Sequence, residues 1–259
     1  MRVSAFGKTD QGKRRSNNED DLALVDLSAG RALPDHAARE LPVGAQGVLL
    51  AVCDGVGGRK AGEVASGLAL EVLAQEMESI APSCPKRDLF RAAVEKVNAR
   101  VWQEASTDPA LKGMATTLTA AVLCQRRAIL AHVGDSRAYF LRGEKIRQIT
   151  RDQSFVQSLI QSGALSEEDA LQSPFRNVIL QAIGRKTSVE VALDAIDLTS
   201  GDLLLLCTDG LSEKVRPEEM AERLSASSLS EAVESLIALA NERGGEDNIT
   251  ALAARVEED

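Results

Sequence analysis

Consecutive strand-type runs are the feature that most restricts how this chain can fold. Four of them follow one another between residues 117 and 150, separated only by polar or glycine-containing turns: TLTAAVLC, AILAHV, RAYFLR and KIRQIT. Strands joined by short turns pair antiparallel, because a parallel pair needs a crossover of a dozen or more residues. The segment therefore predicts an antiparallel meander.

Strand-type runs and helical periodicity also occupy the rest of the chain. Further strands are predicted at 3–9, 21–27, 47–53, 177–183, 189–198, 202–207 and 248–256. Helices are predicted at 61–80, 87–105, 153–163, 166–171, 217–226 and 229–242. Ser166 and Asp169 form a capping-box pattern at the start of the fourth helix. The strands occur in runs and outnumber the helices, which favours an α+β class built on antiparallel sheets.

The Gly-, Pro- and Ala-rich segment 28–46 has the composition of a linker between domains. The 27 residues before it hold only two strands, which cannot bury a core alone. We therefore interpret 28–46 as an insertion and expect residues 1–259 to form one domain, which the chain length allows.

The charge and composition exclude several classes of partner and location. A net charge of −9 and 3% aromatic residues disfavour a nucleic-acid backbone or an anionic membrane as the main partner. No apolar run approaches the ~20 residues that span a bilayer, and the N-terminus lacks a signal-peptide core. We therefore expect a cytoplasmic, unanchored protein. The four cysteines show no C-x-x-C spacing, so we expect buried thiols rather than a disulfide framework: Cys53, Cys84, Cys124 and Cys207.

Two apolar runs end in the same way, in an aspartate followed by a glycine. LLAVCDG places Asp54 before Gly55, and LLLLCTDG places Asp209 before Gly210. A buried strand can deliver such a carboxylate to the edge of a sheet, and the glycine lets the backbone carbonyl approach a bound ion. Either copy alone is more simply explained as an Asp-Gly turn.

Further acidic residues occur next to predicted strands. Together with Asp54 and Asp209 they favour one shared carboxylate site over separate Asp-Gly turns. Glu19 and Asp20 lead into one predicted strand, and Asp247 leads into the last one. Carboxylates at the starts of some antiparallel strands and the ends of others meet at one rim. Oxygen ligands without a nearby His or Cys favour a hard ion, Mg²⁺ or Mn²⁺ rather than Zn²⁺.

Two other charged residues lie close to these acids in the sequence pattern. Arg15 precedes Glu19 by four residues and could bind phosphate oxygens, although a surface countercharge is the simpler reading and Arg14 serves equally by composition. Asp135 lies at a turn between two strands, where capping of the turn is an alternative role. His36 and His132 fit no nucleophilic triad, and we assign neither a catalytic role.

Five short motifs combine these residues in a fixed order. They are RSNNED (15–20), DGVGG (54–58), GDSR (134–137), TDGL (208–211) and GGEDNIT (244–250). Their order and spacing, over almost the whole chain, resemble those of the metal-dependent PP2C-type protein phosphatases, in the bacterial branch of that family. The resemblance implies a β-sandwich of two antiparallel sheets flanked by helices on both sides. It also implies hydrolysis of phosphoserine and phosphothreonine in proteins phosphorylated by a Ser/Thr kinase, by a lone catalytic domain that we expect to be a monomer.

The same resemblance implies a binuclear Mn²⁺ or Mg²⁺ centre. Asp54 would bridge both ions, and the carbonyl of Gly55 would bind one of them. Asp209 and Asp247 would complete the other ion's ligands. Asp135 would join a third, weaker metal site together with Asp209.

The remaining motif residues are implied to act on water and on the phosphoryl group. Glu19 and Asp20 would hold metal-bound waters or a ligand, and Arg15 would bind the phosphoryl oxygens. A water shared by two cations would attack phosphorus directly, without a covalent phosphoenzyme. The catalytic set implied for this chain is therefore Arg15, Asp54 and Asp209.

The chain departs from the family pattern at three positions. Animal relatives have a His where this chain has Val56, and many bacterial relatives have His where it has Arg59 and Gln153. None of these is an implied metal ligand, but the proton donor to the leaving oxygen is left unassigned.

The region 152–184 corresponds to the family's flap, a mobile element beside the active site. We hypothesise that it selects substrates and that Arg176 either contacts the phosphoprotein or stabilises the flap.

Two other functions compete with an active phosphatase. A catalytically silent, phosphopeptide-binding regulatory module on the same fold ranks lower, because such modules usually lose a metal carboxylate and every matched one is present here. A structural Ca²⁺-binding β protein explains the acids but not Arg15 together with the two Asp-Gly strand ends.

Overall fold

Two antiparallel sheets form the centre of the molecule. The computed structural model describes residues 1–33, 39–57, 61–80, 83–171 and 173–257. The first sheet has the order β10 (Lys145–Gln148), β9 (Arg137–Arg142), β12 (Leu203–Cys207), β13 (Ile249–Glu257), β1 (Arg2–Asp10) and β4 (Arg39–Pro42). The second has the order β11 (Ala192–Asp197), β8 (Arg127–Val133), β7 (Leu118–Cys124), β5 (Val48–Val56), β2 (Asp20–Asp26) and β3 (Arg31–Leu33). A short strand, β6 (Ala115–Thr116), pairs with the end of β5.

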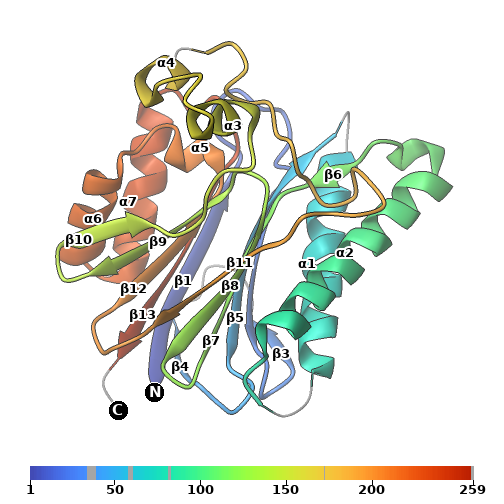
Figure 1. Cartoon of the computed structure of the whole chain (residues 1–259). Helices are drawn as coiled ribbons and strands as arrows, with labels where there is room; N and C mark the ends of the chain where they lie inside the picture. Colours follow the sequence, from blue (N-terminus) through green and yellow to red (C-terminus); the bar gives the residue numbers. More distant parts are fainter. Residues whose placement is uncertain (34–38, 58–60, 81–82, 172, 258–259) are drawn as a thin grey trace.

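Helices cover the outer face of each sheet (Figure 1). Helices α1 (Ala61–Ser79) and α2 (Arg87–Thr107) pack on the second sheet, and α6 (Pro217–Ala226) and α7 (Leu229–Glu242) pack on the first. Helices α3 (Phe155–Gln161), α4 (Glu167–Leu171) and α5 (Asp209–Ser212) lie at one end of the sandwich, and a 3-10 turn, η1 (Pro109–Leu111), follows α2. The predicted α+β sandwich with helices on both sides is confirmed.

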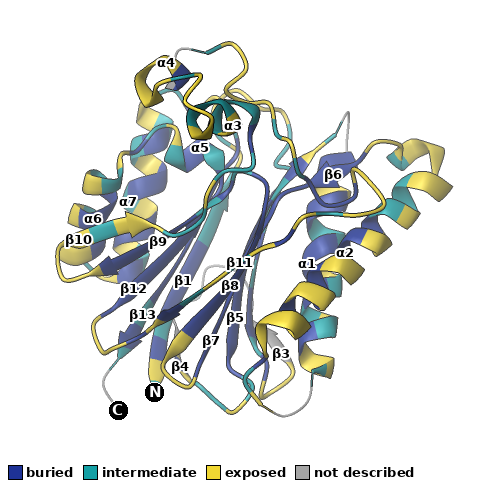
Figure 2. Ribbon diagram, in the orientation of Figure 1, coloured by how far each residue is buried: buried dark blue, intermediate teal, exposed yellow. Residues whose placement is uncertain are grey.

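Each central strand is buried on both faces, because one face meets the other sheet and the opposite face meets helices (Figure 2). In β5, Leu49 and Ala51 pack under α1 and α2, whereas Val48 and Leu50 face the first sheet. This double burial explains why the central strands read as continuous apolar runs rather than as alternating ones. Among the described residues, no helix is long and apolar enough to cross a membrane.

The predicted four-stranded meander is wrong, although its four strands are present. β7 pairs with β8 in the second sheet, and β9 pairs with β10 in the first, but β8 and β9 do not pair with each other. The turn at 134–136 therefore crosses from one sheet to the other. A strand pattern shows that a turn is present but not which sheet receives the next strand, since both sheets bury the same kind of side chain.

Two other segments differ from the sequence prediction. Residues 177–183 do not form a strand, because their backbone bonds go to different partners: Ile179 bridges Ser154, and Ile183 bridges Thr116. The insertion 28–46 contains two short edge strands, of which β3 pairs with β2 in the second sheet and β4 pairs with β1 in the first. The insertion thus lengthens both sheets at the same side of the sandwich.

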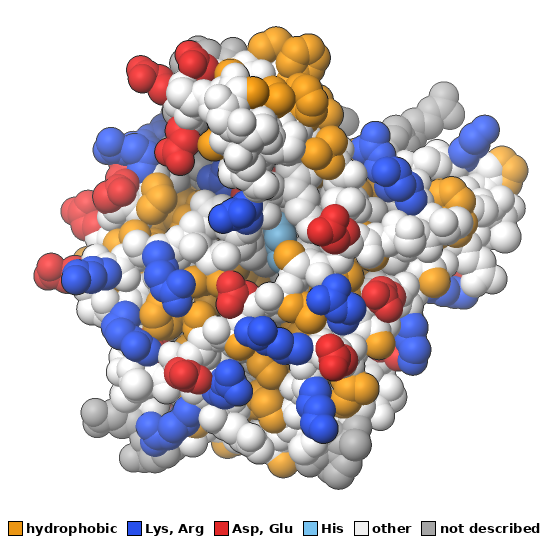
Figure 3. Space-filling view, viewed as in Figure 1, with side chains coloured by type: hydrophobic (Ala, Val, Ile, Leu, Met, Phe, Trp, Pro, Cys, Tyr) orange, Lys and Arg blue, Asp and Glu red, His pale blue; other side chains and the backbone are white. Residues whose placement is uncertain are grey.

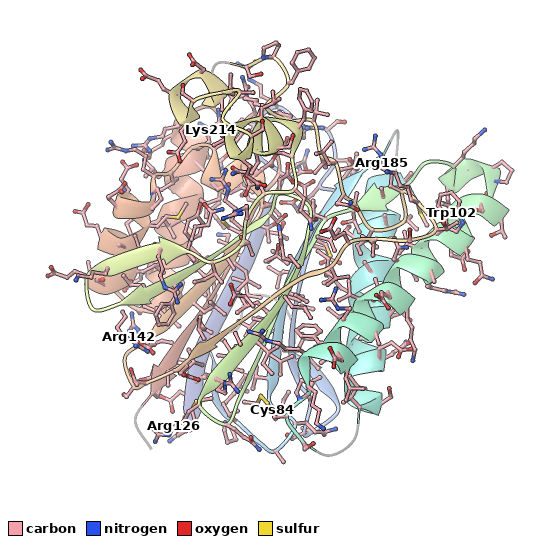
Figure 4. All side chains as sticks on the ribbon, viewed as in Figure 1. Cys84, Trp102, Arg126, Arg142, Arg185 and Lys214 are labelled. Carbon is pink, nitrogen blue, oxygen red and sulfur yellow. A yellow bond between two sulfur atoms is a disulfide. The ribbon has the colours of Figure 1, made fainter. Side chains whose placement is uncertain are left out.

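A disulfide joins Cys84 and Cys124, which corrects the prediction of four free thiols. Cys84 lies between α1 and α2, and Cys124 ends β7, so the fold brings together residues 40 apart in sequence. Sequence spacing could not reveal the pair, because the packing of α1 and α2 on the second sheet creates it. Cys53 and Cys207 are buried free thiols, as predicted. Figure 4 places Cys84 at the end of the sandwich opposite α3 and α4.

Reduction of this disulfide is expected to lower the free energy of unfolding by about 2–4 kcal/mol, because it releases a closed loop of the unfolded chain. Denaturant titration of the oxidised protein and of Cys84→Ser measures the change, with Cys53→Ala as a control that removes a thiol but no bond. Activity should be retained, because Cys124 is at the end of β7, whereas Asp54 is bonded to Thr117 just before the start of β7. Alkylation of all four cysteines in the unreduced, unfolded protein would contradict the pairing.

Candidate functional site

Asp20 and Asp54 lie directly opposite each other at one rim of the second sheet. They are register partners on β2 and β5, which are antiparallel neighbours. β5 continues past Asp54 to Val56, where its partner changes from β7 to β6. Asp54 therefore lies at the rim as predicted, but within β5 rather than at its end.

Asp209 and Asp247 come to the same rim from the first sheet. Asp209 begins α5 directly after β12, and Asp247 lies two residues before β13, which pairs with β12. Helix α5 packs tightly on the loop before β13, because a Cβ on Gly210 would collide with the carbonyl oxygen of Asn248. Close packing also explains the glycine after Asp54, because a Cβ on Gly55 would collide with the carbonyl oxygen of Gly62 in α1. Both glycines allow close packing at the rim.

Asp135 lies in the turn that passes between the two sheets, and Thr117 links this turn to Asp54. The backbone N–H of Thr117 donates to Asp54 O at 2.9 Å, and the Asp54 N–H donates to Thr117 Oγ1 at 2.9 Å. Thr117 Oγ1 also lies 2.7 Å from Ser136 Oγ. The positions of Asp54 and Asp135 are therefore coupled through one buried threonine.

Arg15 reaches the site from the loop between β1 and β2. The N–H groups of Lys13 and Arg14 donate to Gly245 O at 2.7 and 3.2 Å, which docks this loop on the segment before β13. Arg15 Nη2 then donates to Asp247 Oδ2 at 2.6 Å, and this bond is the main cause of its raised pKa. Arg15, rather than Arg14, is therefore the guanidinium at the carboxylates. Its side chain is 50% exposed, so it faces both the site and solvent.

Asp20, Asp54, Asp209 and Asp247 lie at this rim, termed the acidic rim, and carboxylates in and beside it perturb one another strongly. Burial raises the pKa of Asp54 and of Asp209 well above the usual value, and each also feels repulsion from neighbouring aspartates, which include Asp20 for Asp54 and Asp135 for Asp209. Burial raises the pKa of Asp20 to about 7 and that of Asp135 to about 6. Burial also raises the pKa of Glu19. The fold thus gathers acidic groups at a cost to their ionised forms, which a bound cation would offset.

Hydrogen bonds from the protein hold two of these carboxylates. The hydroxyls of Thr208 and Thr250 donate to Asp20 Oδ2 at 2.7 and 2.8 Å, and Arg15 occupies Asp247 Oδ2. In the part of the chain that the structure describes, no three His, Cys, Asp or Glu side chains form a ready-made metal-binding group. Asp20 Oδ2 and Asp247 Oδ2 are therefore already hydrogen-bonded within the protein.

One carboxylate oxygen of the site is suited to a bound cation. Asp209 Oδ1 is buried and has no hydrogen-bond partner, the one such side-chain atom among the described residues. A buried carboxylate oxygen without a donor costs about 1–3 kcal/mol unless something else compensates it. The side-chain atoms nearby that could bind a metal ion are carboxylate oxygens, which suit Mg²⁺ or Mn²⁺. The residues present therefore fit a hard divalent ion.

Four polar residues of the site were missed in the sequence, and one of them is Thr250, whose hydroxyl donates to Asp20 Oδ2. Thr117 and Thr208 bond to the backbone or side chains of the rim aspartates, and Asn248 holds the Glu19 loop: Asn248 Oδ1 accepts from Glu19 N at 2.8 Å, and its Nδ2 donates to Asn17 O at 2.9 Å. Thr208 and Asn248 each adjoin a predicted aspartate, which was the available signal. No sequence pattern marked Thr117 as different from other strand residues.

His132 supports the turn that carries Asp135 and plays no part in the acidic rim. It is 2% exposed, with Nδ1 2.9 Å from Thr119 Oγ1 and Nε2 3.1 Å from Arg151 O. A neutral ring protonated at Nε2 donates to Arg151 O, and burial lowers the pKa of His132 to about 4. His36 lies outside the described residues.

This lowered pKa predicts a loss of stability in acid. The folded protein resists protonation of His132 while the unfolded chain accepts it, so this contribution is complete above about pH 6.5 and is lost towards pH 4. The rim carboxylates, whose pKa values are raised, act in the opposite direction. The test is therefore the difference in unfolding free energy between wild type and His132→Gln, which should shrink by about 2 kcal/mol between pH 7.5 and pH 5. A difference that does not change with pH would contradict a neutral His132.

The flap region 152–184 is fastened to the turn that carries Asp135. Arg137 makes bidentate bonds to Asp152, with Nη2 to Oδ2 at 2.7 Å and Nε to Oδ1 at 3.0 Å. Gln153 N donates to Gly134 O at 2.7 Å, and Gln153 Oε1 accepts from Gly134 N at 2.8 Å. Arg176, whose role was left open, lies 3.9 Å from Glu213 just after α5. It therefore connects the flap to the end of α5.

Comparison with known proteins identifies the family. The model of the protein phosphatase 2C family matches residues 26–252. The chain belongs to this family. The matched residues include Asp54, Asp135, Asp209 and Asp247, whereas Arg15 and the other N-terminal motif residues precede them.

The relatives of the chain are bacterial phosphatases. The chain is 36% identical over 249 residues to the serine/threonine phosphatase stp of Listeria monocytogenes, covering 95% of this chain and 92% of that protein. The crystal structure of the Mycobacterium tuberculosis serine/threonine phosphatase PstP superposes with a TM-score of 0.85 at 36% identity, covering 100% of both chains. The catalytic domain of PstP in complex with two manganese ions superposes with a TM-score of 0.82 at 35% identity, again over 100% of both chains.

Proposed function

We propose that this chain is a metal-dependent protein serine/threonine phosphatase that hydrolyses phosphoserine and phosphothreonine. The observation that carries the proposal is the buried Asp209 Oδ1 without a donor, within a group of mutually repelling carboxylates in a phosphatase 2C fold. Relatives that share 35–37% identity over almost the whole chain are named serine/threonine phosphatases. We take residues 1–259 to act as one catalytic domain.

The acidic rim is the proposed binding place of two divalent cations, Mn²⁺ or Mg²⁺. Asp54 is proposed to bridge them, with the Gly55 carbonyl on one ion and Asp209 and Asp247 on the other. When bound, such ions lower the pKa of coordinated water and polarise phosphoryl oxygens. The PstP complex with two manganese ions supports this choice of metal by relationship. Asp135, next to the flap attachment, is the proposed side chain for a third, weaker ion shared with Asp209.

The chain's own residues would then position the substrate. Arg15 is proposed to bind the phosphoryl oxygens, because its guanidinium lies at the rim, is half exposed and can form paired hydrogen bonds. Arg15 must loosen its bond to Asp247 for that carboxylate to bind an ion with both oxygens. Glu19 and Asp20 are proposed to orient water, with Asp20 held by Thr208 and Thr250. The donor of the proton to the leaving oxygen is not assigned.

The cellular setting is also proposed. We infer a cytoplasmic monomer that acts in signalling by reversing the work of a Ser/Thr kinase. The net charge of −9 and the 3% aromatic residues disfavour a nucleic acid or an anionic membrane as the main partner. A silent phosphopeptide-binding module is not favoured by any observation, because the matched carboxylates are all present at the rim.

Hydrolysis of p-nitrophenyl phosphate and of a phosphothreonine peptide, each with Mn²⁺ or with chelator, tests the function. We expect turnover of both substrates with Mn²⁺ and none with chelator. A protein that binds the phosphopeptide without turnover would be the silent module, and a protein that does neither would not be a phosphatase.

A further inference from the structure

The flap carries an exposed apolar surface. Among the described residues, six large apolar side chains are exposed, and three of them lie within the six positions 175–180, between α4 and β11. Phe175 is 54% exposed, Val178 43% and Leu180 42%; these three residues are termed the flap patch. Hydrophobic side chains gather over the upper edge of the molecule in Figure 3, where Figure 1 places this segment. Exposed apolar clusters on a soluble domain often mark a binding surface.

The backbone beneath the flap patch is held by specific bonds. Phe155 N donates to Val178 O, and Leu180 N donates to Gln153 O, both at 2.8 Å. The Phe175 ring packs edge-on against Phe155, with ring centroids 5.8 Å apart. The same contacts that fix the backbone leave the three side chains facing solvent. Their exposure is therefore a feature of the packed flap and does not come from a loose end of the chain.

Short chains of contacts connect the flap patch to the candidate site on both sides. Gln153, which accepts from Leu180 N, is also bonded to Gly134, the neighbour of Asp135. Arg176 lies 3.9 Å from Glu213, whose N–H donates to Asp209 O at 2.8 Å. The segment that carries the flap patch is thus connected to the turn of Asp135 and to Asp209 through short chains of contacts.

Two of the remaining exposed apolar residues border the site on its other side. Val56, 38% exposed, is two residues after Asp54, and Val64, 40% exposed, lies in the first turn of α1. Its neighbour Glu63 accepts a hydrogen bond from Asn17 in the Arg15 loop at 3.2 Å. The candidate site is therefore bordered by apolar side chains from the flap and from the start of α1.

We propose that the flap patch binds an apolar side chain next to the phosphorylated residue of the substrate. This inference rests on the proposed function. A phosphorylated residue at the rim brings its neighbours, spaced about 3.3 Å apart in an extended segment, over the bordering surface. Burial of an aliphatic or aromatic side chain there removes apolar area of both partners from water. The favoured substrates are thus phosphopeptides with Leu, Ile or Phe within about two residues of the phosphorylated one.

The experiment compares two phosphothreonine peptides that differ only in the flanking residues, Leu or Ser, together with p-nitrophenyl phosphate. Wild type should hydrolyse the Leu peptide with a kcat/KM about tenfold higher than the Ser peptide. The variant Val178→Ser/Leu180→Ser should reduce this ratio to about two, with unchanged turnover of p-nitrophenyl phosphate. Leu89→Ser is the matched control, because Leu89 is 45% exposed but lies in the first turn of α2.

Each outcome separates this inference from the proposed function. Absence of p-nitrophenyl phosphate turnover in wild type removes the proposed function itself. Normal p-nitrophenyl phosphate turnover without a preference between the peptides overturns only the proposal that the flap patch binds an apolar side chain of the substrate. A preference that survives in the flap variant, or that is lost equally in Leu89→Ser, also overturns it.

Discussion

Replacing Asp209 with Asn is expected to reduce metal-dependent hydrolysis by a factor on the order of 10³ and, at the same time, to stabilise the metal-free protein. Asp209 carries the buried oxygen without a donor, and its pKa is raised by burial and by repulsion from Asp135 and Asp247. Loss of the charge removes that repulsion, so we expect the free energy of unfolding in chelator to rise by about 1–2 kcal/mol. Denaturant titration in chelator and kcat with Mn²⁺ measure the two effects.

Asp202→Asn is the matched control, because Asp202 is also buried but is fully paired. Arg142 donates to both of its oxygens, at 2.8 and 2.7 Å, and Thr199 N donates at 2.6 Å. Burial acts to raise the pKa of Asp202, but these bonds outweigh it and lower the pKa. Arg142 is labelled in Figure 4 well away from α3 and α5. This variant should lose about 1–3 kcal/mol of stability and keep its activity. If Asp209→Asn also destabilised the metal-free protein, the repulsion would not be a property of the site.

Replacing Arg15 with Ala is expected to lower kcat/KM for a phosphopeptide by about 10²-fold, mainly through KM. The loss follows from the charge-assisted hydrogen bonds that a guanidinium makes to phosphoryl oxygens. Metal affinity should be maintained or increased, since the variant frees Asp247 Oδ2. Arg14→Ala is the control, because Arg14 anchors its loop through its backbone N–H, which the substitution keeps. Equal activity of wild type and Arg15→Ala would show that Arg15 is a surface countercharge.

The predicted carboxylates reached one rim because strand direction is readable from the sequence. Asp20 begins a strand and Asp54 nearly ends one, and antiparallel pairing of adjacent strands places such residues at the same edge. Helix α5 (Asp209–Ser212) was not predicted, but the other six α-helices among the described residues lie within two residues of the predicted bounds. α6 and α7 match the expected bounds, since a proline and a capping serine mark their starts. These features depend on local sequence, which is why they were accessible.

The features that could not be predicted depend on tertiary packing. The turn at Asp135 passes between sheets, and the Cys84–Cys124 bond forms between a helix connection and a strand end. The choice of Arg15 over Arg14 was likewise undecided, because it depends on how the loop docks on Gly245. The apolar segment 177–183 forms only isolated bridges, so Val178 and Leu180 face solvent in the flap patch, whereas Ile183 is buried in the core.

The number of Mn²⁺ ions bound per chain, measured by isothermal titration calorimetry of the chelator-stripped protein, tests the proposed metal site most directly. Wild type should bind two ions in the acidic rim, with release of protons near neutral pH because binding removes them from carboxylates of raised pKa. Asp54→Asn, which removes the proposed bridging charge, should lose at least one ion. Absence of Mn²⁺ binding by wild type, or the same two ions bound by Asp54→Asn, would contradict the binuclear site.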